Sequence, residues 1–271
     1  MNTELTQQQI DSYRENGFIV IENWLTSEEL EEWREAVDGA VVARDGRKLP
    51  GQTEANEDKS YYDHVFIQRL NLWQDSKRLR KLMLDPRIGK MACDLESIYG
   101  IRVWHDQALI KQPWANQTSF HLDVPYWSFT SIHAISIWIA LDDVTLENGC
   151  LFFLPGTHKK QNFDNVPIGP NMGDIFTVHS EFASIKAVPA PMNAGSCSFH
   201  NGLTVHGAHA NLTPGWRRAM TCAFMPDGCT FNGRQNILTK EQVERLKIGD
   251  LMVDDAQNPL VYHRSKEYAG V

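Results

Sequence analysis

The sequence predicts a mainly β domain with flanking helices, and three observations support this. The first hundred of the 271 residues carry helix-capping signals and apolar residues at helical spacing. After Gly100 the pattern changes to short runs rich in β-branched and aromatic residues, separated by glycine, proline and asparagine. Several short strands with turn signals indicate a β-sandwich or a barrel. No internal repeat divides the chain, so we expect a single domain over residues 1–271.

The N-terminal part predicts two helices and one strand in its first 43 residues. A capping box at residues 6–9 predicts a short helix that ends near Gly17. Residues 18–21 are a β-branched run typical of a strand. A second capping box at residues 26–29 begins a helix that we expect over residues 28–43.

A polar loop is expected over residues 45–60, before helical patterns return over residues 76–100. Those patterns break at Asp85, which can cap a second piece with Pro86 in its first turn. We therefore expect residues 1–100 to be mostly helical support for the β core.

The β core is expected over residues 101–235, with a C-terminal helix and tail over residues 236–271. The strand signals within the core lie at residues 101–111, 132–141, 151–154 and 218–224. A capping box at Thr239 begins the last helix.

The composition argues against nucleic-acid and membrane partners and favours a reducing compartment. The 34 acidic residues exceed the 26 basic ones, which argues against a nucleic-acid partner. No apolar run reaches the roughly 18 residues of a membrane span, so no membrane partner is expected. The five cysteines are odd in number and form no C-x-x-C motif, and the N-terminus lacks a signal-peptide pattern. We expect a cytoplasmic protein; its oligomeric state is not predicted.

The first chemical motif is the pair His121 and Asp123. On a strand, residues two apart share one face, so the segment would present an imidazole beside a carboxylate. Alone, this motif occurs by chance in many proteins.

A second histidine and an arginine lie downstream, and together with the first pair they match the chemistry of one kind of metal site. Two imidazoles and one carboxylate, from His121, Asp123 and His206, can occupy one face of an octahedral Fe(II) and leave three positions open. A 2-oxo acid can fill two of these positions and dioxygen the third. Ferrous ion, one carboxylate and 2-oxoglutarate leave one net negative charge, which the guanidinium of Arg217 can neutralise in bidentate geometry.

Some of these positions have rivals in the same segment. His200 and His209 compete with His206 for the role of the second histidine. Arg218 competes with Arg217, and strand alternation allows only one of the two to face inward.

Several ordered segments carry a family resemblance. They are residues 13–30, the His121–Asp123 motif, residues 138–143 followed by 147–158, and residues 205–217. In these segments the chain resembles the phytanoyl-CoA dioxygenase (PhyH) family of Fe(II)/2-oxoglutarate-dependent oxygenases. The resemblance covers roughly residues 6–225 and implies a double-stranded β-helix, also described as a jelly-roll or cupin-like core.

Carried over residue by residue, the resemblance implies His121, Asp123 and His206 as iron ligands. It implies Arg217 as the anchor of the C5 carboxylate of 2-oxoglutarate and places Trp138, which can also be read as barrel core, in the co-substrate pocket.

The resemblance concerns two further positions near the co-substrate. A looser alignment with the family implies that Gln68 also contacts the co-substrate. Ala208 departs from the family, since some members have a hydroxyl there. One hydrogen bond to the co-substrate is therefore missing or supplied from elsewhere.

Aromatic residues cluster around the metal motif. They can be core packing, or they can line the mouth of a substrate pocket, since such pockets are mostly apolar. The residues proposed for the substrate are Trp114, Phe120, Tyr126 and Trp127.

The resemblance implies an enzyme that hydroxylates an unactivated C–H bond of a small organic substrate. Its cofactors would be Fe(II), 2-oxoglutarate as co-substrate and O2, with ascorbate helpful in vitro, and its products would include succinate and CO2. Asp123 argues against a halogenase, which needs a glycine or alanine at that position. Desaturation and cyclisation stay open, as does the identity of the substrate, including a CoA thioester.

Three further functions also stay open. They are an oxygenase that needs no 2-oxo acid, a non-catalytic metal-binding homologue and a zinc hydrolase.

Overall fold

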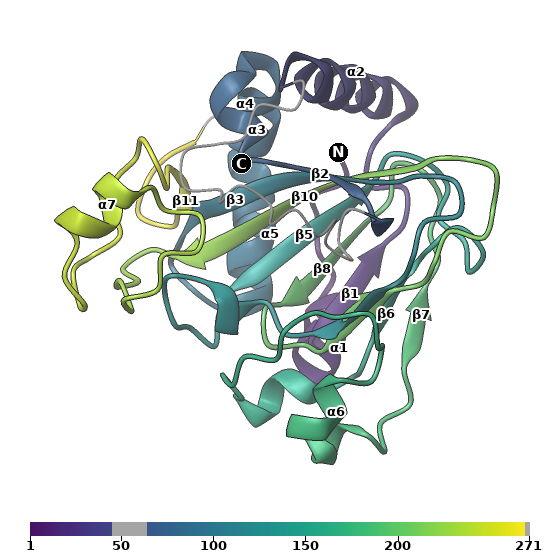
Figure 1. Ribbon diagram of the computed structural model, residues 1–271. Coiled ribbons are helices and arrows are strands. Elements are labelled where there is room, and N and C mark those ends of the chain that lie inside the picture. The colour runs from purple at the N-terminus through teal and green to yellow at the C-terminus, as the bar shows by residue number, and fades with distance from the viewer. Residues whose placement is uncertain (45–63, 269–271) are drawn as a thin grey trace.

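The computed structural model describes residues 1–44 and 64–268, which form two antiparallel sheets flanked by helices (Figure 1). The larger sheet has the order β1-β8-β5-β10-β3-β11, and β2 also pairs with β3. Its strands are β1 (Phe18–Ile21), β8 (Cys197–Asn201), β5 (Ile135–Ala140), β10 (Arg217–Pro226), β3 (Gly100–Lys111), β11 (Leu260–His263) and β2 (Ile67–Leu70). The smaller sheet has the order β4 (Thr118–His121), β9 (His206–Ala208), β6 (Leu151–Phe153) and β7 (Val188–Ala190).

The helices of the N-terminal part cover one face of the larger sheet (Figure 1). They are α1 (Gln7–Asn16), α2 (Ser27–Arg44), α3 (Leu72–Asp75), α4 (Lys77–Met83) and α5 (Pro86–Glu96). Two shorter helices, α6 (Ile175–Val178) and α7 (Lys240–Arg245), lie in later loops. The mainly β architecture with flanking helices is confirmed.

The predicted helix ends are confirmed where capping chemistry fixes them. Thr6 and Gln9 form the reciprocal capping box of α1, and Gly17 ends that helix in the left-handed conformation. Asp85 caps α5, whose first residue is Pro86, and the boxes at residues 26–29 and 239–242 also form.

Side chains along β5 point alternately to the two faces of the larger sheet. Ile135, Ile137 and Ile139 point to the face covered by the helices and belong to the apolar cluster there. The intervening Ser136 and Trp138 face the other way, toward the smaller sheet, where they line a cavity. The site described below therefore lies between the two sheets.

The main differences from prediction concern short or displaced strands. The predicted strand over residues 132–141 begins only at Ile135. Neither β2, within the part expected to be helical, nor β11, within the C-terminal tail, was predicted, yet both pair with β3. The strands β4, β7, β8 and β9 were also missed, since they lack the runs of β-branched and aromatic residues that marked the equally short β1 and β6. The loop predicted at residues 45–60 lies outside the described residues.

The two antiparallel sheets form the predicted jelly-roll core. Within the described residues, no helix combines the length and apolar character needed to cross a bilayer.

Candidate functional site

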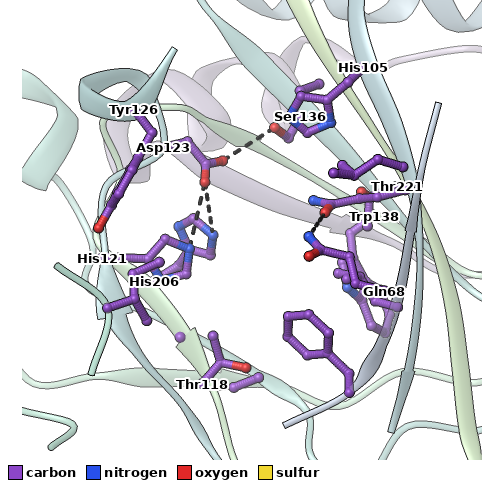
Figure 2. A pocket seen from close by; sticks show the side chains of 18 of the residues that line it. Gln68, His105, Thr118, His121, Asp123, Tyr126, Ser136, Trp138, His206 and Thr221 are labelled. Carbon is purple, nitrogen blue, oxygen red and sulfur yellow. Dashed lines mark hydrogen bonds and ion pairs between the residues drawn. The ribbon is translucent and has the colours of Figure 1, made fainter. Parts of the chain in front are cut away.

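Three side chains with metal-binding chemistry meet in the cavity between the sheets (Figure 2). His121 ends β4 and His206 begins β9, and the two are direct partners in the ladder that joins these strands. Asp123 follows β4 and directly precedes the 3₁₀ helix η2 (Val124–Tyr126). The prediction that His121 and Asp123 share one face of a strand is therefore wrong, because the strand ends at His121; a turn brings the two side chains together instead.

The distances suit the sharing of one ion. The carboxylate Oδ1 of Asp123 lies 3.6 Å from Nε2 of His121 and 3.9 Å from Nε2 of His206. One ligand atom from each residue falls within 4.8 Å of the others. These three residues can thus hold a metal ion from one side.

Backbone carbonyls set the tautomers of the two histidines. Nδ1 of His121 lies 2.8 Å from the carbonyl of Ser119, and Nδ1 of His206 lies 3.0 Å from that of Thr204. A carbonyl only accepts, so each Nδ1 carries the proton and donates. The lone pair of each Nε2 is then free to bind a metal beside Asp123.

Electrostatics favour the neutral form of His206 and the ionised form of Asp123. Burial, together with the charge of His121, lowers the pKa of His206 to about 3. Burial alone would raise the pKa of Asp123, but the imidazoles of His206, His121 and His200 hold it well below its ordinary value. At neutral pH the site therefore offers the neutral imidazole of His206 beside the ionised carboxylate of Asp123.

Arg217 is a buried cation whose donors are incompletely used. It begins β10, is 2% exposed, and lines the same cavity as the three metal-binding residues. Nη2 donates to the carbonyl of Gly149 at 3.3 Å, while Nε and Nη1 have no partner among the described residues. Burial lowers the pKa of Arg217 to about 10, and its Cζ lies 5.2 Å from the ring centroid of Trp138. Such a guanidinium fits an anionic ligand.

The arginine next in sequence serves the opposite face of the sheet. Arg218 pairs with Asp142 at 2.7 Å and Asp38 at 2.6 Å. Strand alternation thus turns only Arg217 toward the cavity, as the sequence predicted.

The rival histidines have different surroundings. The ring of His209 lies against Phe152, and this histidine does not line the cavity. His200 lines the cavity and contacts the other oxygen of Asp123, at 3.5 Å.

A single cavity of about 540 Å³ joins the metal-binding residues to Arg217. Trp138 and Gln68 also line it, and Nε2 of Gln68 donates to the side-chain oxygen of Gln107 (Figure 2). Thr118 faces the cavity as the direct strand partner of Ala208. A hydroxyl is therefore present beside the position where the chain has alanine.

The four aromatic residues proposed for the substrate divide into two pairs. Tyr126 and Trp127 line the cavity near Asp123. Trp114 is 67% exposed, and Phe120 packs its ring against Phe176; neither lines the cavity. We therefore assign no substrate contact to Trp114 or Phe120.

Several cavity residues were missed. His105, Ser136 and Thr221 face the cavity from three neighbouring strands of the larger sheet (Figure 2). Burial lowers the pKa of His105 to about 4, so its ring is neutral at physiological pH. Ser136 could have been found by its two-residue spacing from Trp138, whereas His105 needs the register of β3 against β10.

Comparison with protein families gives one match. Residues 13–219 match the family model described as "Phytanoyl-CoA dioxygenase (PhyH)". Among curated proteins, the human peroxisomal phytanoyl-CoA dioxygenase is 27% identical in an alignment of 263 residues that covers 92% of this chain and 76% of that protein.

Two solved structures from nogalamycin biosynthesis share the fold. The non-haem α-ketoglutarate-dependent carbocyclase SnoK aligns with a TM-score of 0.77 and 27% identity, over 95% of this chain and 96% of that one. The epimerase SnoN, solved with Fe3+, α-ketoglutarate and nogalamycin RO, aligns with a TM-score of 0.71 and 23% identity, over 94% and 98%.

Proposed function

The chain belongs to the phytanoyl-CoA dioxygenase family, and from this premise we propose that it hydroxylates an unactivated C–H bond of a small organic molecule. As a member of that family it is a 2-oxoglutarate-dependent non-haem iron oxygenase. The reaction class follows from the family, whereas hydroxylation and the type of substrate are our proposal.

The proposal rests on one observation. The three residues that could bind a metal and the buried Arg217 line the same cavity, and both have binding capacity that the described residues do not use. His121, Asp123 and His206 would hold Fe(II) from one side and leave three coordination positions open. Arg217 offers a guanidinium with two unpaired donor nitrogens in the same cavity. A 2-oxoglutarate chelated at the metal would place its C5 carboxylate toward such a cation, with Trp138 beside it.

The bound iron would supply the activation of dioxygen. In the balanced reaction one oxygen atom enters succinate, formed with CO2 from 2-oxoglutarate, and the other enters the substrate as a hydroxyl. The protein's part is to orient the reactants and to exclude water from the cavity.

Two further residues complete the proposed co-substrate site. The hydroxyl that Ala208 lacks would come from Thr118, its strand partner. Gln68, held by its hydrogen bond to Gln107, would present an amide from β2. Both side chains line the cavity from different strands, so each can be tested separately.

The remaining cavity wall suits an uncharged substrate. Among the described lining residues, Asp123 and Arg217 are the ones with a fixed charge, and both have roles in the proposed site. Tyr126, Trp127 and Ile237 provide apolar surface on the substrate side. A neutral, carbon-rich molecule fits this wall better than a phosphate-bearing thioester does.

The decisive experiment is substrate-stimulated formation of succinate. Purified protein with Fe(II), ascorbate and 2-oxoglutarate would be screened against pools of neutral metabolites and acyl-CoA thioesters, with His121→Ala as the control. Succinate formed only by the intact metal site, together with a product that gains one oxygen atom, would support the proposal. Turnover that needs no 2-oxo acid, activity with Zn(II) instead of Fe(II), or no turnover in any pool would favour the other functions raised by the sequence.

A second candidate reaction is oxidative ring closure. It is favoured by the likeness to SnoK, named as a carbocyclase. Here the substrate would lose two hydrogen atoms, which leave as water with the second oxygen atom. Mass spectrometry of the product separates the two reactions, since hydroxylation adds oxygen and ring closure removes hydrogen.

We propose the cytoplasm as the compartment. The five cysteines are all free, which supports a reducing environment. Because relatives include peroxisomal enzymes, microscopy of the tagged protein is the direct test.

A further inference from the structure

The two oxygens of Asp123 face different partners. Oδ1 lies toward Nε2 of His121 and of His206, as described above. Oδ2 lies 3.4 Å from the hydroxyl of Ser136 and 3.5 Å from Nε2 of His200. The carboxylate is therefore divided between a metal-facing oxygen and an oxygen that faces the larger sheet (Figure 2).

The tautomer expected for His200 differs from that of His121 and His206. Its Nδ1 is buried and has no hydrogen-bond partner among the described residues. A proton on that nitrogen would be a buried, unsatisfied donor, which is costly. Nε2, by contrast, lies 3.5 Å from Oδ2 of Asp123, so a proton on this nitrogen has a carboxylate beside it. His200 thus places a protonated nitrogen next to Asp123, whereas His121 and His206 present lone pairs.

The larger sheet fixes both donors in place. Ser136 on β5 and His200 on β8 are direct partners in the ladder between these strands. Ser136 is 5% exposed and His200 is 4% exposed, so neither side chain has room to rearrange freely. The ring of Phe153, from the smaller sheet, packs against His200 with centroids 5.5 Å apart.

We propose that Ser136 and His200 are positioning residues that hold Oδ2 of Asp123 away from the metal, so that Asp123 gives one oxygen to ferrous ion. A carboxylate that binds through both oxygens would occupy a fourth coordination position. Only two positions would then remain, too few for a chelating 2-oxo acid and dioxygen together. This inference rests on the proposed function, because it concerns the same iron and co-substrate.

The test measures metal and co-substrate binding without turnover. Wild type, His200→Phe, Ser136→Ala and the double variant would be titrated anaerobically, first with Fe(II) and then with 2-oxoglutarate. We expect about 10–100-fold weaker iron binding in the double variant, the usual effect of losing groups that orient a metal ligand. At saturating iron, the visible charge-transfer absorption of the Fe(II)–2-oxo acid chelate should weaken in both His200→Phe and the double variant.

Two further variants separate positioning from packing. His200→Gln keeps a donor near the place of Nε2 and should restore the absorption. His209→Phe replaces a histidine outside the cavity, whose ring lies against Phe152. It should leave iron affinity unchanged, because no hydrogen bond or ion pair joins His209 to Asp123 in the described structure.

The outcomes are distinguishable. If wild type shows no Fe(II)–2-oxoglutarate absorption, the proposed function itself fails. If wild type shows it and His200→Phe matches wild type in affinity and absorption, only the positioning role is overturned. A folded His200→Gln that behaves like His200→Phe also overturns it. If His200→Phe does not fold, Ser136→Ala decides: affinity and absorption equal to those of wild type count against the inference, and a loss in either supports it.

Discussion

His121 and His206 are direct partners across the ladder between β4 and β9, and their ring centroids lie 4.3 Å apart. The strands come this close because the residue after His206 is a glycine. A Cβ at Gly207 would lie 2.7 Å from the carbonyl oxygen of Thr118. The spacing of the two metal-facing imidazoles therefore depends on a position without a side chain.

We expect Gly207→Ala to push β4 and β9 apart. The clash is with backbone, so the variant should lose about 1–3 kcal/mol of stability and bind Fe(II) more weakly. Thermal unfolding and iron titration measure the two effects. Gly39→Ala is the matched control: nothing lies within 4 Å of its added Cβ, and in mid-helix it should gain about 0.5–1 kcal/mol. A Gly207→Ala variant as stable as wild type would contradict the close approach.

Arg217→Ala should raise the KM for 2-oxoglutarate strongly. Loss of a buried ionic partner costs about 2–5 kcal/mol, which corresponds to a factor of roughly 30 or more. Arg217→Lys should rescue little, since an ammonium does not match a carboxylate in bidentate geometry. Arg218→Ala, on the opposite face, should leave this KM unchanged. Unaltered 2-oxoglutarate dependence in Arg217→Ala would favour an oxygenase that needs no 2-oxo acid.

Thr118→Val tests the source of the hydroxyl that Ala208 lacks. If the Thr118 hydroxyl binds the co-substrate, its loss should weaken 2-oxoglutarate binding by about 0.5–1.5 kcal/mol, while Thr118→Ser should retain wild-type binding. Titration calorimetry with the iron-loaded protein under anaerobic conditions measures the difference. Equal affinity in wild type and Thr118→Val would show that no such hydrogen bond forms.

A pH-dependent effect is expected at Lys111, the strand partner of Arg217. Burial, and then the charge of Arg217, lower the pKa of Lys111 from 10.5 to about 6. Between these pH values the unfolded chain binds the additional proton, so stability rises with pH. The free energy of unfolding of wild type should therefore rise relative to Lys111→Met by up to about 1.4 kcal/mol per pH unit over roughly pH 7–9. Urea unfolding across that range measures it, and parallel curves for the two proteins would contradict the lowered pKa.

The predictable parts of the fold were those governed by local chemistry. Capping boxes such as that at Thr6 act within one turn, so the sequence alone located the first residues of α1, α2 and α7. Strand alternation required that only one of Arg217 and Arg218 face inward, and the family resemblance selected Arg217.

The parts that could not be predicted depend on contacts between distant segments. The strands β4 and β9 are too short to show a pattern, and pairing with each other makes them strands. The place of Asp123 depends on a turn after β4 rather than on strand geometry. Likewise, the donor role of His200 appears only when its register against Ser136 is known, and the sequence could offer it only as a rival ligand.

The proposed binding of 2-oxoglutarate at the guanidinium of Arg217 would link the supply of this co-substrate to the lifetime of the protein. A co-substrate that satisfies those nitrogens binds the folded chain and not the unfolded one, so it acts as a folding ligand. At a hundred times its Kd it would add about 2.7 kcal/mol of stability. Cells short of 2-oxoglutarate would then hold a less durable enzyme as well as a slower one, and abundance would follow supply without any dedicated regulator.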